Sequence, residues 1–314
     1  MINIALLGTW HVHFNGYARQ AKGFSDVKIT SLWDPDETAG REAAAKYDCE
    51  FVADLDTILA REDVDAVIVC TSTDMHKEVI TKAANAGKHI FTEKVLCFTE
   101  KDALEVADAV KKSGVKFCIS FPWRSRSDFQ WIKGAVESGM FGTINYCRMR
   151  NAHNGASAGW LPDTFYDKAT CGGGAMMDLG AHSMYILNWL LGAPEKASSA
   201  FTNVMVNSVE DNAVTVLTYK GGVIGVSETA FVSQNCPFEF ELVGTKGTAL
   251  MGGFIDKPCY NVGDGWVFPH LPERQPDPME LWIDGIVNGT EIPYGIDDAV
   301  ALSRTMELAY KNIF

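Results

Sequence analysis

The segment Ile4-Ala5-Leu6-Leu7-Gly8-Thr9-Trp10-His11-Val12-His13 decides the fold of the N-terminal half, because an apolar strand runs directly into a glycine. A glycine here lets the chain turn sharply and directs the amides of the next helix at a bound phosphate, as in dinucleotide-binding folds. The usual Gly-x-Gly-x-x-Gly spacing would continue with glycines where this chain has Trp10 and His13, and a side chain at position 10 keeps the backbone farther from the phosphates. We predict a dinucleotide loop formed by Gly8, Thr9, Trp10, His11 and Val12.

Short apolar runs alternate with amphipathic stretches along the rest of the N-terminal half, and the amphipathic stretches have apolar residues at three- and four-residue spacing. This repeated order of strand and helix is typical of a doubly wound parallel sheet in an α/β protein. The predicted strands are Ile2–Leu7, Val27–Trp33, Ala66–Cys70, His89–Thr92 and Lys116–Ser120. The predicted helices are Asp36–Lys46, Met75–Ala86 and Thr99–Ser113.

The C-terminal half is dominated by successive strands, which favours a mainly antiparallel sheet in an α+β domain. The turn Lys220-Gly221-Gly222 between two of these strands predicts a hairpin. The predicted strands are Thr143–His153, Ser198–Asn207, Ala213–Tyr219, Val223–Phe231 and Phe238–Val243. The predicted helices are Asp128–Ser138, Ala175–Leu191 and Asp297–Phe314. We therefore predict two domains, residues 1–121 and 122–314, with the C-terminal helix able to pack back onto the first.

The composition is that of a globular protein, since 47% of the 314 residues are hydrophobic and 21% are charged. The net charge of −13 opposes non-specific attraction to nucleic acid or to an anionic membrane, so a small uncharged substrate fits better. The sequence shows neither a leader segment nor an apolar run near the ~20 residues that span a bilayer, which predicts a cytoplasmic location. The eight cysteines are scattered without a Cys-x-x-Cys pair, and we expect reduced thiols, no disulfide and no structural metal.

Asp34 ends the second predicted strand, about where a carboxylate accepts hydrogen bonds from the adenosine ribose of a dinucleotide. A carboxylate there would repel a 2′-phosphate, which favours NAD over NADP. An alternative interpretation is that Asp34-Pro35-Asp36 opens a turn and caps the next helix. The two roles are compatible.

Two motifs carry a resemblance to a known family. The stretch Asn85-Ala86-Gly87-Lys88-His89-Ile90-Phe91-Thr92-Glu93-Lys94 resembles the Ala-Gly-Lys-His…Glu-Lys-Pro signature of the glucose-fructose oxidoreductase, inositol dehydrogenase and rhizopine-catabolism (Gfo/Idh/MocA) family. The stretch from Gly172 to His182 resembles the second motif of that family, a glycine run followed by a helix with Asp and His four residues apart. Val95 departs from the signature, because it replaces the proline after the lysine.

The resemblance covers essentially the whole chain and implies an N-terminal Rossmann domain followed by an α/β domain with a large open sheet. In the family this open sheet commonly mediates homodimers or homotetramers. The resemblance also implies further cofactor contacts from the loop after the third strand and from the lysine motif, namely Thr71, Ser72, His76, Glu93 and Lys94.

Lys94, Asp178 and His182 are the predicted catalytic centre. Oxidation of a secondary alcohol needs a base for the hydroxyl proton, and histidine titrates near neutrality, so His182 is the candidate base. Asp178 lies four residues before it, which would place both on one helical face. By resemblance, Lys94 would hydrogen-bond the same hydroxyl and favour the developing alkoxide. Asp178 would orient the substrate or the imidazole.

Substrate contacts are predicted from Arg124 and from the loop between residues 150 and 171, which carries His153, Trp160 and Tyr166. Aromatic rings and amides suit polyhydroxylated ligands. An alternative is that Trp160 and Tyr166 pack between subunits. His11 and His13 are interpreted as structural or phosphate-adjacent, and Asp178 with His182 lacks the further ligands of a metal site.

The sequence therefore predicts an NAD-dependent dehydrogenase acting on a secondary alcohol of a sugar, inositol or related polyol. Two alternatives stay open. One is an enzyme that uses NAD without net redox change to process glycosides. The other is a catalytically silent NAD-binding sensor, suggested by Trp10 and His13 in the phosphate loop.

Overall fold

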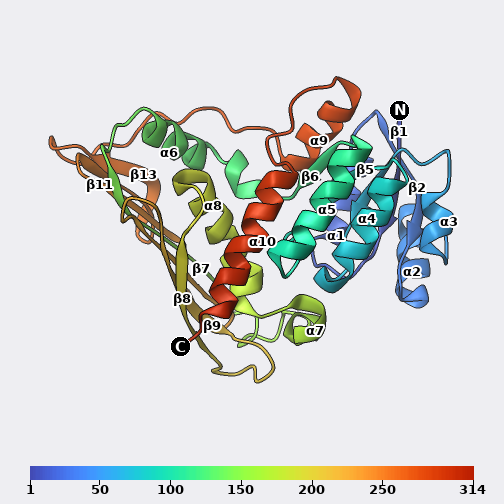
Figure 1. Ribbon diagram of the computed structural model, residues 1–314, viewed down its shortest axis with the longest axis horizontal. Helices are drawn as coiled ribbons and strands as arrows, with labels where there is room; N and C mark the ends of the chain where they lie inside the picture. The colour runs from blue at the N-terminus through green and yellow to red at the C-terminus, as the bar shows by residue number, and fades with distance from the viewer. The chain divides into compact units, whose positions relative to one another are not determined.

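The computed structural model describes residues 1–314, with the exception of the side chain of Asp256. It divides into two compact units (Figure 1). The first contains Met1–Ser120 and Pro276–Ser303, and the second contains Phe121–Gln275 and Arg304–Phe314. The segment 276–303 thus groups with the N-terminal residues, while the domain limits 1–121 and 122–314 stay a prediction.

The first unit is built on a parallel sheet with the strand order β3-β2-β1-β4-β5-β6. The order reverses between β1 and β4, and ligands of such sheets bind in the crevice at that switch point. The predicted doubly wound parallel sheet is confirmed. Its strands are β1 (Ile2–Leu7), β2 (Val27–Trp33), β3 (Glu50–Phe51), β4 (Ala66–Val69), β5 (His89–Thr92) and β6 (Phe117–Ile119).

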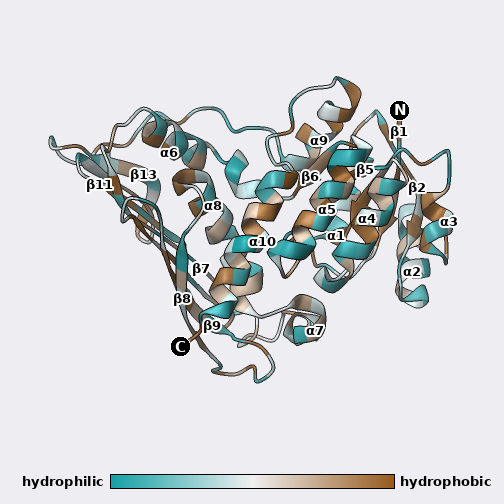
Figure 2. Cartoon of the chain, in the orientation of Figure 1, coloured by the Kyte–Doolittle hydropathy of each residue, from teal (hydrophilic) through white to brown (hydrophobic). Residues whose placement is uncertain are grey.

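Helices connect these strands, and some of them begin at a capping side chain. The carboxylate of Asp36 accepts hydrogen bonds from the amides of Thr38 and Ala39, which starts α2. Figure 2 shows hydrophobic and hydrophilic residues mixed along α4 and α5, as amphipathic helices on a sheet require. The helices are α1 (Phe14–Lys22), α2 (Glu37–Tyr47), α3 (Leu55–Leu59), η1 (Thr73–Met75), α4 (His76–Asn85), α5 (Glu100–Ser113) and α9 (Pro278–Val287). A last helix, α10 (Ile296–Lys311), contributes residues to both units.

The second unit contains a seven-stranded sheet in the order β13-β12-β11-β7-β10-β9-β8. Its neighbouring strands are antiparallel except for β7 and β10, so the predicted mainly antiparallel sheet is confirmed. The predicted hairpin joins β9 to β10, and Gly221 and Gly222 supply the positive φ angles of its turn. The strands are β7 (Ile144–Ala152), β8 (Lys196–Thr202), β9 (Asn212–Thr218), β10 (Ile224–Ala230), β11 (Glu239–Gly244), β12 (Gly247–Gly252) and β13 (Ile255–Asn261).

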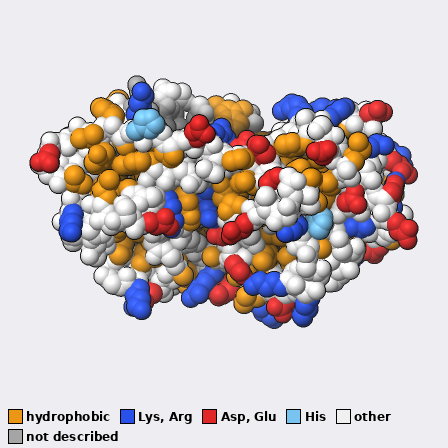
Figure 3. Space-filling model, turned by 90° about the horizontal axis from the view of Figure 1, so that it is seen from above, with side chains coloured by type: hydrophobic (Ala, Val, Ile, Leu, Met, Phe, Trp, Pro, Cys, Tyr) orange, Lys and Arg blue, Asp and Glu red, His pale blue; other side chains and the backbone are white. Residues whose placement is uncertain are grey.

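Helix α8 packs on one face of this sheet, against β7 and β10. The alternation of buried and exposed residues along β9 shows that the opposite face is open, because Val214 and Val216 point away from the buried side chains of Thr215 and Leu217. Figure 3 shows that hydrophobic side chains also reach the surface of the molecule elsewhere, mixed with charged ones. The helical elements of this unit are η2 (Pro122–Ser125), α6 (Ser127–Glu137), η3 (Asp163–Tyr166), α7 (Lys168–Cys171), η4 (Met176–Gly180) and α8 (Ala181–Leu191).

The predicted helix Ala175–Leu191 is not uniform. Its first turn, η4, is a π-helix, and regular α-helix begins only at Ala181. A π-turn holds more residues per turn than an α-helix, and such turns are frequent at functional sites. The turn changes the angular spacing between Asp178 and His182 from the one assumed for a regular α-helix.

Among the described residues, none of the helices combines the length and the apolar character that a membrane crossing demands.

Candidate active site and dinucleotide loop

Gly8 allows the turn after β1. Its φ angle is +85°, a conformation that side chains rarely adopt, and its amide donates to the carbonyl of Trp33 at 2.8 Å. A Cβ atom at Gly8 would lie 2.6 Å from the backbone nitrogen of Thr71. The loops after β1 and β4 therefore touch at the switch point of the sheet, and only glycine permits this contact.

Asp34 is buried at the end of β2 and fixes the glycine loop. Its Oδ2 accepts hydrogen bonds from the amide and the hydroxyl of Thr9, at 2.6 and 2.7 Å. Its Oδ1 accepts from the amide of Asp36 at 2.8 Å, as the turn interpretation expects. A carboxylate oxygen has two lone pairs, so Oδ1 keeps capacity for a hydroxyl donor of a ligand.

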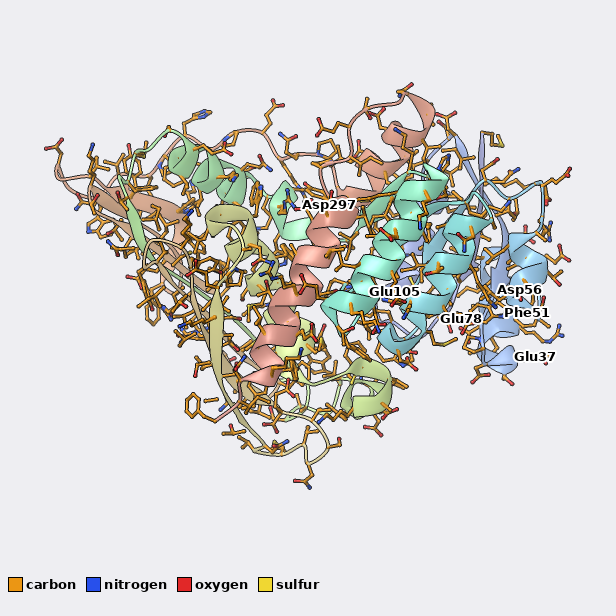
Figure 4. All side chains as sticks on the ribbon, in the orientation of Figure 1. Glu37, Phe51, Asp56, Glu78, Glu105 and Asp297 are labelled. Atoms are coloured by element: carbon orange, nitrogen blue, oxygen red, sulfur yellow. The ribbon has the colours of Figure 1, made fainter. Side chains whose placement is uncertain are left out.

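A pocket of about 350 Å³ opens beside Asp34. Figure 4 shows three of its residues, Glu37, Phe51 and Asp56, close to one another on and beside α2 and α3. Acidic groups outnumber the single lysine of the lining, so the pocket favours a ligand part without negative charge. The pocket is lined by Trp33, Asp34, Pro35, Glu37, Phe51, Ala53, Asp54, Leu55, Asp56, Met75, Glu78, Val79 and Lys82.

The loop after β4 places Thr71, Ser72 and His76 in buried positions. The hydroxyl of Thr71 has no hydrogen-bond partner among the residues that the structure describes, which is costly for a buried polar group unless a ligand supplies one. His76 has both ring nitrogens against backbone carbonyls, Nδ1 at 2.9 Å from Val95 and Nε2 at 3.2 Å from Thr71. His76 therefore holds two loops together, and its influence on a cofactor would act through them.

Glu93 follows β5 and is buried among polar groups of the glycine loop. Its Oε1 lies 2.6 Å from Nδ1 of His13 and 3.4 Å from Nδ1 of His11, and it also accepts from the hydroxyl of Tyr17. Its Oε2 accepts from the amide of Lys94 at 3.0 Å. Burial by itself would raise the pKa of Glu93, but the charges of His11 and His13 hold it well below its ordinary value.

Lys94 lies next to this cluster in the first unit and is buried. The peptide bond between Lys94 and Val95 is cis. The other two residues of the predicted catalytic centre, Asp178 and His182, lie in the second unit. The first unit thus brings Lys94 together with the predicted cofactor residues, and the second unit brings Asp178 and His182 together on consecutive helical turns.

His182 is held by two side chains. Its Nδ1 lies 3.0 Å from the hydroxyl of Tyr185, and its ring stacks on Trp123 with centroids 5.4 Å apart. The amide of Trp123 donates to the same tyrosine hydroxyl at 3.2 Å, and the ring of Tyr185 stacks on Phe121. These contacts fix the orientation of the imidazole, as a base in catalysis requires. Sequence reasoning missed Trp123 and Tyr185, although a tyrosine three residues after a helical histidine is a usable signal.

Asp178 is half-buried, and its charge acts on His153 as well. Burial lowers the pKa of His153, and the Asp178 charge opposes that shift. His153 stacks on Phe231 with centroids 5.2 Å apart and contacts Trp160. Its Nδ1 accepts from the amide of Gly155 at 3.0 Å, which leaves the ring proton on Nε2. The structure thus brings His153, which contacts Trp160 of the same predicted loop, within reach of the charge of the predicted catalytic aspartate.

Arg124 and Tyr166 complete the predicted substrate residues. Arg124 is buried and lies over the ring of Trp189, at 4.9 Å from its centroid. Tyr166 is half-buried and meets Phe231 edge to face. Tyr166 thus shares one aromatic ring with His153, whereas Arg124 packs beside α8 rather than in that cluster.

The glycine run before η4 is required by packing within the second unit. A Cβ atom at Gly173 would lie 2.0 Å from the hydroxyl of Tyr310, and one at Gly174 would lie 2.0 Å from the carbonyl of Glu210. The groups that approach Gly173 and Gly174 most closely are thus atoms of the protein itself. The carboxylate of Glu210 accepts from the amides of Gly174 and Met176 at 2.9 and 3.0 Å and from Tyr310 at 2.5 Å.

The strand order of the first sheet and the turn at Gly8 define a dinucleotide-binding protein. The chain belongs to the GFO/IDH/MocA family of oxidoreductases. Residues 2–121 match the family model described as an oxidoreductase family with an NAD-binding Rossmann fold, and residues 129–250 match the GFO/IDH/MocA C-terminal domain.

The chain is also similar to individual proteins of known name. The inositol 2-dehydrogenase of Rhizobium meliloti (strain 1021) is 26% identical, over 99% of this chain and 97% of the relative. A 2,7-anhydro-N-acetylneuraminate hydratase of Mediterraneibacter gnavus is 28% identical, over 65% of this chain and 53% of the relative. The solved structure of levoglucosan dehydrogenase with NADH and levoglucosan has a TM-score of 0.84 at 18% identity, over 99% of this chain and 96% of that one. This last likeness establishes the fold.

Proposed function

We propose that this protein transfers a hydride between a secondary alcohol of a sugar, inositol or related polyol and NAD. The observation that carries the proposal is the environment of His182, whose imidazole is fixed by Tyr185 and Trp123 four residues after Asp178. The inositol 2-dehydrogenase among the relatives supports the substrate class.

The residues of the first unit fit a bound NAD. The positive end of the α1 dipole and the turn at Gly8 suit the pyrophosphate, and the buried hydroxyl of Thr71 lies on the adjoining loop. Asp34 has capacity to accept from a ribose hydroxyl, and the acidic pocket beside it suits the adenosine. The same acidic lining would repel a 2′-phosphate, so we propose a preference for NAD over NADP.

The catalytic proposal assigns one task to each residue. When NAD is bound, its nicotinamide accepts the hydride. His182 takes the hydroxyl proton at Nε2 while Nδ1 faces the hydroxyl of Tyr185. Lys94 donates a hydrogen bond to the substrate oxygen and stabilises its developing negative charge. Asp178 orients the substrate, and its negative charge offsets positive charge in the site.

The substrate loop supplies the remaining contacts in this proposal. The ring of His153 lies between Phe231 and Trp160 and offers a donor at Nε2 to a substrate hydroxyl. Trp160 is 55% exposed, so its face is available to the C–H side of a sugar ring. Tyr166 and Arg124 would contact more distant groups of the substrate.

A test mixes the purified protein with NAD and a panel containing myo-inositol, glucose and levoglucosan. Turnover appears as absorbance of the reduced nicotinamide. We expect Lys94→Ala and His182→Asn to lower kcat by about 10²–10⁴, and Lys112→Ala, a lysine 81% exposed, to leave it unchanged. NADP in place of NAD should raise KM. No turnover with a broad panel of polyols, despite NAD binding, would reject the dehydrogenase assignment.

A second candidate function follows from the hydratase among the relatives. The same residues could oxidise a sugar transiently, eliminate or add a group, and return the hydride, with no net change of NAD. Product formed from an anhydro sugar or a glycoside at catalytic NAD, without accumulation of reduced nicotinamide, would favour this function over the first.

We also propose that the open face of the second sheet joins subunits in a homodimer or homotetramer. Val214, Val216 and Ile224 expose apolar side chains on these strands. Sedimentation of the wild type and of a Val216→Lys variant tests the proposal, since a monomeric wild type would reject it. A cytoplasmic location stays a prediction.

A further inference from the structure

One cluster of side chains in the first unit has no assigned part in the transfer of the hydride or the proton. His11, His13 and Glu93 each offer one ligand atom, and these atoms all lie within 4.8 Å of one another. Two of the residues come from the loop between β1 and α1, and Glu93 comes from the end of β5. The carboxyl ends of parallel strands meet at one edge of the sheet, which explains how residues 80 apart in sequence become neighbours.

The separation of the ligand atoms suits a small cation. In a tetrahedral site with metal–ligand distances of about 2.0–2.1 Å, ligand atoms are about 3.4 Å apart. Oε1 of Glu93 lies 3.4 Å from Nδ1 of His11 and 2.6 Å from Nδ1 of His13. The second distance is that of a hydrogen bond, so His13 would move outward by less than an ångström to admit an ion. Its side chain is 48% exposed, which leaves room for this movement.

Neighbouring groups already orient the ligands as outer-shell groups do in metal sites. The amide of His13 donates to Nδ1 of His11 at 3.2 Å, which selects the neutral tautomer with its lone pair on Nδ1, and this hydrogen bond has to be released when that lone pair binds an ion. The amide of Lys94 holds Oε2 of Glu93, so Oε1 faces the two imidazoles. Burial raises the pKa of Tyr17 well above its ordinary value, and its hydroxyl therefore stays a donor to Glu93 and a hydrogen-bond partner of Ser120.

We propose that His11, His13 and Glu93 bind one divalent first-row transition-metal ion, such as Zn²⁺ or Co²⁺. Two imidazoles and a carboxylate are the ligands of such ions, whereas Mg²⁺ and Ca²⁺ prefer oxygen ligands throughout. The positive charge would neutralise the buried carboxylate of Glu93. Because His13 is exposed, at least one coordination position would face solvent. The ion is not assigned a part in hydride transfer.

Calorimetry with Zn²⁺ tests this site on the full-length, chelator-treated protein without NAD. We expect one ion per chain, and at least a tenfold loss of affinity in His13→Ala and in Glu93→Gln. His270→Ala is the matched control, since this exposed histidine lies outside the cluster, and it should bind Zn²⁺ as the wild type does. Co²⁺ gives a second readout, because visible absorption bands of the bound ion should appear in the wild type and disappear in His13→Ala.

Three results would overturn the proposal: no saturable binding in the wild type, Zn²⁺ affinity unchanged in His13→Ala, or Co²⁺ bands retained in that variant. If Glu93→Gln does not fold, His13→Ala alone decides, because its exposed side chain can be removed without loss of the core. Asp178→Asn separates this proposal from the proposed function. It should lose turnover and retain Zn²⁺ binding, because Asp178 belongs to the other unit.

Discussion

Glu93 and Glu210 are both buried, yet their pKa values move in opposite directions. Burial pushes each pKa upward, because it disfavours the charged form. At Glu93 the charges of His11 and His13 outweigh burial and hold the pKa well below its ordinary value. At Glu210 burial prevails, although Tyr310 and backbone amides donate hydrogen bonds to it.

The ionisation of a buried carboxylate therefore depends on the kind of group that neighbours it. Neutral donors lower its pKa by orienting dipoles toward it, whereas a cationic partner also supplies charge. Glu93 is therefore held as an anion in a polar cluster of the first unit, and Glu210 acts as the cap of the helical turn that carries Asp178 in the second unit. The four predictions below test this contrast.

The largest effect is expected for Gly174→Ala, which breaks the cap at Glu210. The new Cβ would lie 2.0 Å from the carbonyl of Glu210, so the backbone has to move. The hydrogen bond from the amide of residue 174 to the carboxylate of Glu210 is then lost. We expect a loss of more than about 3 kcal/mol in the free energy of unfolding, measured with urea. Gly134→Ala in α6, where a Cβ meets nothing within 4 Å, should instead be neutral or slightly stabilising. Equal stabilities of the two variants would contradict this reading of the glycine run.

Glu93→Gln comes next. Because the pKa of Glu93 is lower in the folded protein than in the unfolded chain, its ionisation stabilises the fold at pH values above the ordinary pKa of 4.5. This stabilisation is lost as the pH falls through the pKa of the folded state. The variant should be about 2–4 kcal/mol less stable than the wild type at pH 7, and this deficit should shrink toward pH 4. Urea unfolding at several pH values measures it, and Glu37→Gln, an exposed glutamate, is the control. A deficit that grows on acidification would mean that the cluster does not hold Glu93 as an anion.

The tyrosines that donate to the two glutamates allow a matched pair of substitutions. Tyr17→Phe removes the hydroxyl bonded to Glu93, and Tyr310→Phe removes the one bonded to Glu210. A hydrogen bond to a charged group is worth about 1.5–3 kcal/mol, so we expect a loss of about 2 kcal/mol for Tyr17→Phe at pH 7 and a smaller loss for Tyr310→Phe, because the raised pKa of Glu210 makes its carboxyl less readily ionised. Thermal unfolding of both variants would measure the difference, and the reverse order would remove the contrast between the two sites.

The smallest effect is expected for Glu210→Gln. The raised pKa means that the wild-type carboxyl contributes stability below its unfolded pKa and loses this contribution as the pH rises through the folded value. The neutral amide keeps an acceptor for Gly174 and Met176 and avoids that loss. We expect a change of under about 1 kcal/mol at pH 7, with the stability relative to the wild type improving from pH 4 to pH 7. From pH 4 to pH 7, the stability relative to the wild type should therefore rise for Glu210→Gln and fall for Glu93→Gln. The same direction of change in both variants would refute the comparison.

The sequence was sufficient for the parallel or mainly antiparallel character of each sheet, because the signals of most of their strands are local. The apolar run before Gly8 and the pair Gly221-Gly222 mark a strand end and a hairpin by conformational preference alone. Strands β12 and β13 went unpredicted, because β12 begins and ends with glycine and β13 contains Pro258, and both residue types weaken the pattern that identifies a strand. The π-turn at η4 has no sequence signature, since it arises from packing.

Residues of the candidate site were predictable from the sequence only where several of them lie in one continuous motif. Glu93 and Lys94 were found together, and so were Asp178 and His182. The contacts of His11 and His13 with Glu93 join the loop after β1 to the end of β5, on either side of β4 in the sheet, and could have been anticipated from the strand order. The cap formed by Glu210 could not, because Gly174 and Tyr310 come from distant segments that meet only in the folded unit.

The parallel pairing of β7 with β10 has a consequence for how the chain is made. Strand β7 has its two neighbours, β10 and β11, later in the sequence, so a ribosome releases the centre of the sheet before either partner exists. Until residue 224 and those after it emerge, both edges of β7 lack their ladder hydrogen bonds. Nascent chains that stop between β7 and β10 should therefore be the most prone to aggregate and the best clients for a chaperone.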